Sequence, residues 1–209
     1  MNKNLTVIYV TQNTEDKKFE SKIIKKLRES SAGLPIISIS RIPIKLGTNI
    51  CVGEVPVCDS AFIKQTLKGL LAVKTDYAML TTCGYLYPPE FFTFTPPADT
   101  VAYRYPNVWT LSGKFWKNRC SDYVQMAGRN YWIKMIKKAM RGHKGWKSFD
   151  PPQVFPIANE STWTGENPVV HLITPHTTWR FANIDRHVLP KTGFPLWGTI
   201  DELKTTLEI

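Results

Sequence analysis

The sequence contains no uninterrupted apolar run long enough to cross a lipid bilayer. Its first ten residues, MNKNLTVIYV, enter an apolar strand at once and lack the apolar region and cleavage site of a secretion signal. Cysteine is scarce: the four cysteines form neither a CxxC pair nor a cluster with histidine at the spacing of a zinc site. We therefore expect a soluble, cytoplasmic protein with reduced thiols and no membrane partner.

Acidic residues are almost missing from one segment in the second half of the chain. Between Arg104 and Lys147 lie eleven lysines or arginines and a single acid, Asp122, whereas the rest of the chain has 16 basic and 16 acidic residues. This segment therefore carries the whole net charge of +10. A charge excess concentrated in this way is typical of a surface that binds a polyanion, and we expect nucleic acid. An ordinary solubilising surface is the alternative.

The first hundred residues show a regular alternation of strand and helix signals. Apolar runs predict strands at residues 5–10, 36–40 and 77–80, the last of them broken by the small polar residues 81–84. Helical spacing predicts helices at residues 15–30 and 60–73, the second capped by Ser60. Alternation of this kind builds a parallel sheet with a binding crevice at the carboxyl ends of the strands. The fold class is therefore α/β, and 209 residues suit one domain.

The second half of the chain is richer in aromatic and basic residues. Strands are expected at 101–105, 108–111 and 169–173, and residues 142–168 are expected to form an ordered loop. Ser121 is expected to cap a long helix through Met140, with Val124, Ala127, Tyr131 and Met135 on its apolar stripe. Thr199 and Glu202 form a capping-box signature that opens a short terminal helix.

Several motifs, taken in order, resemble a phage-type group of GT-A-like glycosyltransferases. They are LTVIYVTQNTEDKKFESKIIKKL, LPIISISRIPIKLGTNICVG, FIKQTLKGLLAV, TDY and LYPPEFFTFTPP, with a weaker match at NPVVHLITPHTTWRF. The resemblance implies a GT-A-like, Rossmann-like mixed central sheet flanked by helices in a single domain, residues 1–209. Residues 1–100 would hold the donor and its diphosphate, and residues 101–209 would hold the acceptor. A phage-encoded protein of this kind would act in the cytoplasm of the host cell.

The chain departs from this family at the metal site. No acid occurs between Asp76 and Glu90, and Thr82-Cys83-Gly84 stands where such enzymes carry a Glu-Asp-Asp run. Carboxylates there supply hard oxygen ligands for Mg²⁺ or Mn²⁺, and these three residues offer no comparable set. We therefore expect no metal. His176, which resembles the late metal-proximal histidine of the family, is then expected to donate a hydrogen bond to phosphate.

The expected cofactor is a nucleotide-sugar or another diphosphate donor. By resemblance, the donor crevice comprises Thr11, Gln12 and Asn13 under the nucleotide base, Arg41, Lys45 and Asn49 after the second strand, and Gln65 on the helix that approaches the diphosphate. Without a metal, the charge of a diphosphate leaving group must be met by cationic side chains or backbone N–H groups. Arg41, Lys45, His176 and Arg180 are the candidates, although a solvated side chain is the ordinary role of any single one.

The expected macromolecular partner is DNA that carries a modified pyrimidine. The candidate contacts are Arg129, Lys134, Lys137, Lys138, Arg141, Lys144, Trp146 and Lys147. Trp146, which lies among glycines and basic residues, is expected to be exposed and to stack on an unpaired base. Asp122, Glu160 and Asp185 are the acids nearest the expected acceptor side and are the candidates for a general base, without a spacing that decides among them. His171, inside an apolar strand, is expected to be a core histidine.

Three classes of function follow from these observations. The first is a transferase that moves a sugar from a nucleotide-sugar to a hydroxymethyl pyrimidine in DNA. Within this class, a metal-independent variant adds an amino acid or amine to a pyrophosphorylated hydroxymethyl pyrimidine, as in thymidine hypermodification in phages. The second class is a non-catalytic DNA-binding protein on a degenerate glycosyltransferase fold. The third, transfer to a protein or glycan, is disfavoured by the concentrated positive charge.

Overall fold

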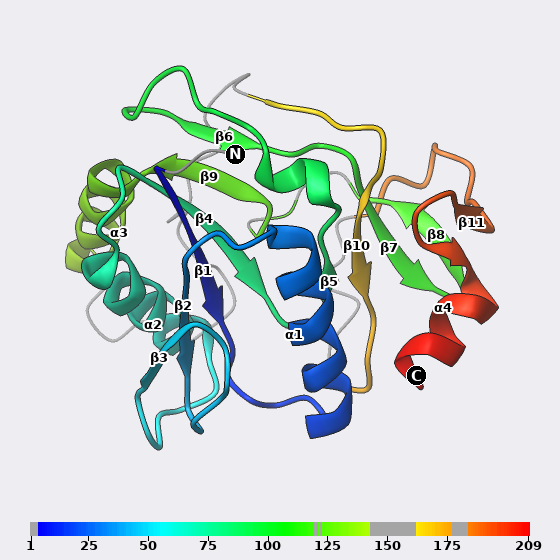
Figure 1. Ribbon diagram of the computed structural model, residues 1–209, viewed down its shortest axis with the longest axis horizontal. Coiled ribbons are helices and arrows are strands. Elements are labelled where there is room, and N and C mark those ends of the chain that lie inside the picture. Colours follow the sequence, from blue (N-terminus) through cyan, green and yellow to red (C-terminus); the bar gives the residue numbers. More distant parts are fainter. Residues whose placement is uncertain (1–3, 119–120, 122, 143–161, 177–183) are drawn as a thin grey trace.

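A computed structural model describes residues 4–118, 121, 123–142, 162–176 and 184–209. A six-stranded mixed sheet lies at its centre, with strand order β3-β2-β1-β4-β9-β6 (Figure 1). The strands are β1 (Leu5–Val10), β2 (Ile36–Ser40), β3 (Thr48–Cys51), β4 (Tyr77–Thr82), β9 (Gln125–Gly128) and β6 (Ala102–Arg104). Strands β1 to β4 are parallel, and β9 runs antiparallel to both of its neighbours. The carboxyl ends of β1 to β4 therefore meet at one edge of the sheet, which we call the carboxyl edge.

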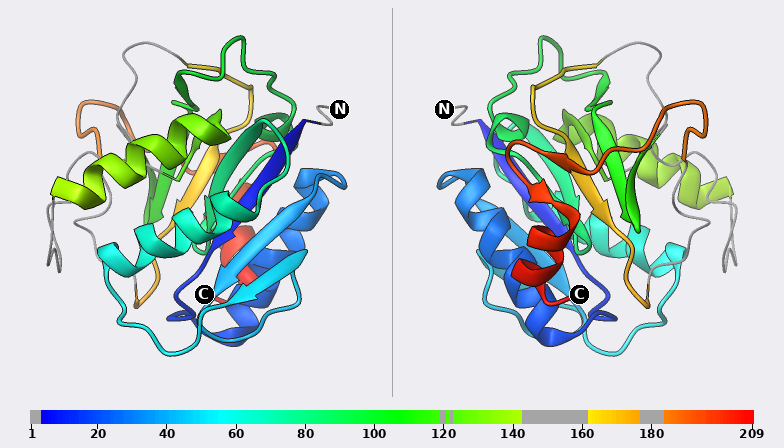
Figure 2. Two further views of the ribbon diagram at one scale, coloured as in Figure 1. Left: turned by 90° about the vertical axis from the view of Figure 1, so that its left-hand side faces the viewer. Right: turned by 90° about the vertical axis from the view of Figure 1, so that its right-hand side faces the viewer.

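Three helices cover the two faces of the central sheet. They are α1 (Lys17–Ser31), α2 (Asp59–Ala72) and α3 (Arg129–Gly142). Alternate residues of β1 show how the layers form: Ile8 packs in one core with α2 and α3, whereas Val7 and Tyr9 pack in another with α1. Figure 2 shows α2 and α3 side by side on one face of the sheet. Burial on both faces explains why β1 is apolar along nearly its whole length.

A second, four-stranded sheet with order β5-β10-β7-β8 packs beyond α1. It comprises β5 (Tyr85–Leu86), β10 (Val169–Leu172), β7 (Val108–Ser112) and β8 (Lys114–Lys117), and the remaining elements are η1 (Pro89–Phe92), β11 (Gly193–Phe194), β12 (Gly198–Thr199) and α4 (Ile200–Leu207). The predicted capping box is confirmed, because Thr199 and Glu202 exchange hydrogen bonds at the start of α4. Among the described residues no helix combines the length and apolar character that a membrane span needs.

The predicted fold class, a mixed α/β sheet flanked by helices, is confirmed by this arrangement. The strands and helices predicted for the first hundred residues lie within a few residues of their predicted positions, whereas β3, β5 and η1 were not predicted. Two local predictions there were wrong. Helix α2 begins at Asp59 after Cys58, so Ser60 is not its cap. Strand β4 continues through Thr82 instead of breaking at Thr81, because both threonines keep the parallel pairing with β1. Their hydroxyls also donate hydrogen bonds to carbonyl oxygens of β1.

The long helix predicted from Ser121 to Met140 was also wrong. Residues Gln125–Gly128 form β9, which pairs with β4 on one side and β6 on the other, and the helix begins only at Arg129. Val124 and Ala127, expected on a helical stripe, are fully buried in and beside this strand. The apolar face of α3 is instead centred on Trp132 and Ile136, both fully buried. The tertiary pairing of β9 overrides a local pattern that is compatible with a helix.

Candidate functional site

The loop after β1 links three elements at the carboxyl edge. The Asn13 side chain accepts hydrogen bonds from the backbone N–H groups of Arg41 (2.8 Å) and Ile42 (2.9 Å), and it donates one to Glu20 of α1 (3.1 Å). Gln12 donates to the carbonyl oxygen of Cys58 at the start of α2 (2.8 Å). Asn13 has a φ of 51°, a left-handed conformation that asparagine tolerates better than most residues. The loop predicted from resemblance therefore lies at the expected edge of the sheet.

Arg41 follows β2 and brings a cation to the same edge. Its Nη1 donates to the carbonyl oxygen of Gln12 (3.3 Å), which holds the guanidinium against the loop after β1. Its Nε is buried and has no hydrogen-bond partner among the described residues. A guanidinium with an unused buried donor is suited to binding an oxyanion, because its fork of N–H groups matches phosphate oxygens.

The end of β4 carries a thiol and a glycine at the positions where the resemblance would place carboxylates. Burial raises the pKa of the Cys83 thiol, and the nearby charge of Glu20 raises it further. Gly84 has a φ of +83°, and β5 begins at the next residue. No group of three or more histidine, cysteine or acidic side chains gathers at a metal-binding distance anywhere in the described part of the chain.

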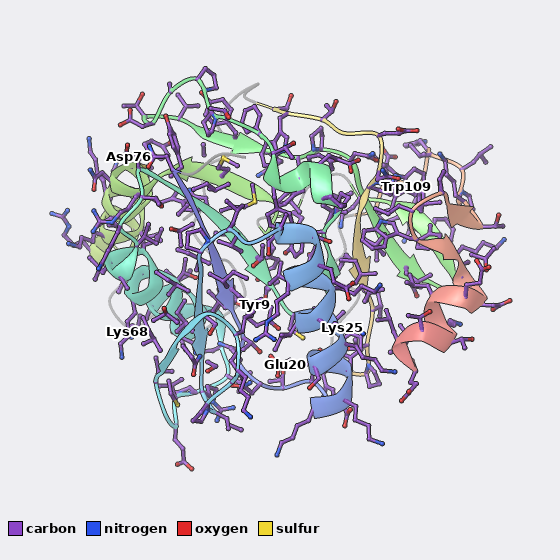
Figure 3. The ribbon with its side chains drawn as sticks, in the orientation of Figure 1. Tyr9, Glu20, Lys25, Lys68, Asp76 and Trp109 are labelled. Carbon is purple, nitrogen blue, oxygen red and sulfur yellow. The ribbon has the colours of Figure 1, made fainter. Side chains whose placement is uncertain are left out.

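Two acids approach this point from α1 and the loop before it, which the sequence analysis missed. Glu20 is only 6% exposed and accepts hydrogen bonds from the Tyr9 hydroxyl (3.2 Å) and from Asn13. Figure 3 shows Tyr9 and Glu20 facing each other between β1 and α1. Glu15 accepts a hydrogen bond from the Thr174 hydroxyl (2.8 Å). The sequence does indicate that Glu20 faces the core, because it follows Phe19 and precedes Ile23 by three residues on the apolar stripe of the helix.

The structure separates the other predicted donor residues into different cavities. Lys45 lines a cavity of about 520 Å³ between α1 and the loop after β2. His176 lines another, of about 510 Å³, near the start of α1 and the end of α4. Glu15 contributes to both cavities, whereas Arg41 lines neither.

Asn49 was expected on the loop after the second strand, but it lies in β3, where its side chain bonds within the protein. Its Nδ2 donates to Ser38 and Ser40, and its Oδ1 accepts from the backbone of Ile44 (3.2 Å). These bonds tie β3 to β2 and to the loop after β2. Thr11 is likewise buried, and its hydroxyl accepts a hydrogen bond from the Asn13 backbone N–H (3.0 Å). Both residues support the carboxyl edge through internal contacts.

The outer face of α3 is cationic, as the sequence analysis predicted for this region. Its four exposed basic side chains are Lys134, Lys137, Lys138 and Arg141, which we call the α3 cationic face. Among the described residues no carboxylate forms a salt bridge with any of them; the salt bridges present join Lys22 to Glu208 and Lys26 to Glu29. Arg129, at the start of the same helix, is used differently. Its Nε and Nη2 donate to the carbonyl oxygens of Leu70 (3.1 Å) and Leu71 (3.5 Å) at the end of α2.

Several predicted site residues lie outside the described residues: Asp122, Lys144, Trp146, Lys147, Glu160 and Arg180. Asp185 is described, and its backbone N–H donates to the carbonyl oxygen of Lys117 at the end of β8 (2.8 Å). Strand β8 is the outer strand of the second sheet, on the opposite side of the molecule from α3 (Figure 1). The structure therefore does not bring Asp185 to the α3 cationic face.

Comparisons with known proteins complete the description of the site. No protein-family model and no curated protein matches this chain. Similar solved structures include a glycosyltransferase involved in glycosylation of the major capsid of PBCV-1, at 10% identity and a TM-score of 0.49 over 80% of this chain and 92% of that one. The galactosyltransferase LgtC in complex with donor and acceptor sugar analogues is 8% identical, with a TM-score of 0.47 over 81% of this chain and 87% of that one. The bifunctional IspDF from Campylobacter jejuni is 11% identical, with a TM-score of 0.46 over 78% of this chain, which spans 50% of its length.

Proposed function

We propose that the protein is a GT-A-type transferase that moves a sugar from a nucleotide-sugar donor to a hydroxymethyl pyrimidine in DNA. The observation that carries the proposal is Arg41, a cation held at the carboxyl edge with a buried N–H group that no described residue uses. A diphosphate bound there would receive charge-assisted hydrogen bonds from the guanidinium. The same contacts would stabilise the negative charge that develops on the leaving group during transfer.

The acceptor strand would lie on the α3 cationic face. Helix α3 packs on α2, whose first turn contacts the loop after β1, so the proposed DNA surface and the proposed donor crevice belong to neighbouring elements. Lysine and arginine side chains that contact phosphates supply affinity without reading the base sequence. Recognition of the modified base would then fall to residues closer to the carboxyl edge.

The second candidate function is non-catalytic DNA binding, and the residues at the end of β4 favour it. Cys83 and Gly84 provide no carboxylate there, and Glu20, the buried acid nearby, already accepts hydrogen bonds from Tyr9 and Asn13. A protein of this kind would keep the α3 cationic face and would have no use for the unused donor of Arg41.

Mass spectrometry of nucleosides separates these functions. DNA containing hydroxymethyl pyrimidines, or their pyrophosphorylated forms, is incubated with the protein and with nucleotide-sugars, amines or amino acids, in Mg²⁺ or in a chelator. A mass gain equal to one sugar confirms the proposal, and a gain equal to an amine or amino acid supports the metal-independent variant. Arg41→Ala should abolish the gain, whereas Arg186→Ala, at an exposed arginine, should preserve it. Unchanged nucleosides, with DNA binding intact, would favour the non-catalytic candidate.

A further inference from the structure

Gln65 lies in the middle of α2 with its polar atoms buried and unused. The residue is 3% exposed, and neither its Oε1 nor its Nε2 has a hydrogen-bond partner among the described residues. Buried amide groups in folded proteins nearly always have partners, because an unpaired one loses its bonds to water and gains nothing in return. An unpaired donor beside an unpaired acceptor on one side chain therefore points to a ligand that supplies both partners.

A cavity of about 230 Å³ lies next to this side chain. One wall is the loop between β3 and α2, with the apolar side chains of Val52, Val55 and Pro56, and the other is the flank of α2 that carries Gln65. Lys64 and Lys68, one helical turn apart and both exposed, complete the lining on the solvent side. Figure 3 shows Lys68 on the outer side of α2. The cavity thus combines apolar walls with one amide and two cations, and Cys58 and Ser60 also line it.

We propose that this cavity binds the base of a nucleoside phosphate, with the edge of the base against Gln65 and the phosphate near Lys64 and Lys68. The base is flat and apolar on its faces, as the walls of the cavity require, and the volume suits a single ring system better than a larger ligand. Its edge carries a donor beside an acceptor, which is the pairing that a glutamine amide makes with a base. An aliphatic ligand would leave the amide unpaired, and a simple anion would leave the apolar walls unused.

Base binding in this cavity is independent of whether the protein transfers a sugar or another group. It also gives Gln65 a different role from the one predicted from resemblance, contact with the base in place of approach to the diphosphate. Two hydrogen bonds connect the cavity to the proposed donor crevice. Cys58 lines the cavity and its carbonyl oxygen accepts from the Gln12 side chain, and the carbonyl oxygen of Gln12 accepts from the Arg41 guanidinium.

Calorimetry with the four nucleoside 5′-monophosphates, and with ribose 5-phosphate as the probe that lacks a base, tests the proposal. At least one nucleotide should bind about tenfold or more tightly than ribose 5-phosphate. Gln65→Leu should remove this difference, and it should melt at or above the temperature of the unaltered protein because it deletes an unpaired buried amide. Gln65→Glu should shift the preference toward cytosine, since a carboxylate only accepts hydrogen bonds. Thr66→Val, at a buried neighbour on the same helix that does not line the cavity, is the matched control and should leave binding unchanged.

A single-stranded oligonucleotide identifies the source of the base. If a strand binds through Gln65 while free nucleotides bind no better than ribose 5-phosphate, the base belongs to a nucleic acid and base binding in the cavity still holds. If free nucleotides and the oligonucleotide both bind Gln65→Leu as tightly as the unaltered protein, and that variant is folded, base binding in this cavity is excluded. Arg41→Ala separates this result from the proposed function, because it should weaken diphosphate binding without changing the preference among bases.

Discussion

The Tyr9 hydroxyl donates a hydrogen bond of 3.2 Å to Glu20, and this pair joins the central strand β1 to helix α1. Tyr9 is fully buried, so the bond forms away from competing water. Tyr9→Phe removes the hydroxyl and leaves the ring in place. We expect it to lower the free energy of unfolding by about 1.5–3 kcal/mol, the usual contribution of a hydrogen bond to a charged group. Urea denaturation measures the change, and Tyr77→Phe, at a partly exposed tyrosine on β4, is the control. Equal losses of unfolding free energy in the two variants would contradict a stabilising hydrogen bond between Tyr9 and Glu20.

Burial of His171 in the second sheet predicts a pH-dependent stability. Its ring stacks on Tyr85 with centroids 4.5 Å apart, and burial lowers its pKa from 6.5 to about 4. Between these values the unfolded chain binds a proton that the folded protein does not. Stability should therefore fall as the pH drops through this window, by about 1.4 kcal/mol per pH unit from this residue. His171→Phe retains a stacked ring and should lose this component, which appears as a difference between the pH profiles of the two proteins. Parallel profiles from pH 4 to 6.5 would show that His171 does not titrate in this way.

The structure confirms sequence expectations where local periodicity and burial agree. Phe19, Ile23 and Leu27 repeat at helical spacing and are all buried on α1, and β1 is apolar because helices cover both of its faces. The failure at β9 has a clear cause. Gln125–Gly128 contains no β-branched residue and runs directly into a helix, so its extended conformation depends on pairing with β4 and β6, which no local pattern encodes.

The candidate site was only partly predictable for a related reason. The loop after β1 follows directly from the end of a buried strand, and the structure places it at the carboxyl edge as expected. Glu20 was missed because the family pattern places its acids around β4, whereas the acid that approaches Cys83 comes from α1, far earlier in the chain. The unpaired amide of Gln65 is a property of three-dimensional packing, and the sequence around it has the ordinary spacing of an amphipathic helix.

We expect the α3 cationic face to carry most of the affinity for DNA. Changing Lys134, Lys137 and Lys138 together to glutamate should weaken binding and flatten the dependence of affinity on salt, because each lost phosphate contact reduces the number of counterions released. The control makes the same change in net charge at Lys17, Lys25 and Lys204, which are exposed on α1 and α4. Fluorescence anisotropy at several salt concentrations measures both effects. Equal weakening in the two triple variants would indicate attraction to overall charge without a defined surface.

Arg41 should determine the affinity for a diphosphate ligand. We expect Arg41→Ala to weaken the binding of a nucleoside diphosphate by about tenfold or more, because it removes a charge-assisted contact at the carboxyl edge. Arg41→Lys should recover only part of the loss, since an ammonium cannot reproduce the fork of donors. Isothermal titration calorimetry provides the measurement, with Arg186→Ala as the control. Unaltered affinity in Arg41→Ala would remove the main support for a donor crevice at this edge.

The backbone conformation of Gly84 disfavours the introduction of a carboxylate at this position. With a φ of +83° the backbone turns there from the central sheet into the second one, and β5 begins immediately afterwards. A side chain at this position would meet little steric obstruction, since a Cβ added there would lie 3.8 Å from its nearest neighbour, the carbonyl oxygen of Leu172. The obstacle is the backbone itself, because residues other than glycine adopt this conformation at a cost of about 1 kcal/mol or more. A carboxylate engineered at position 84 would therefore strain the joint between the two sheets.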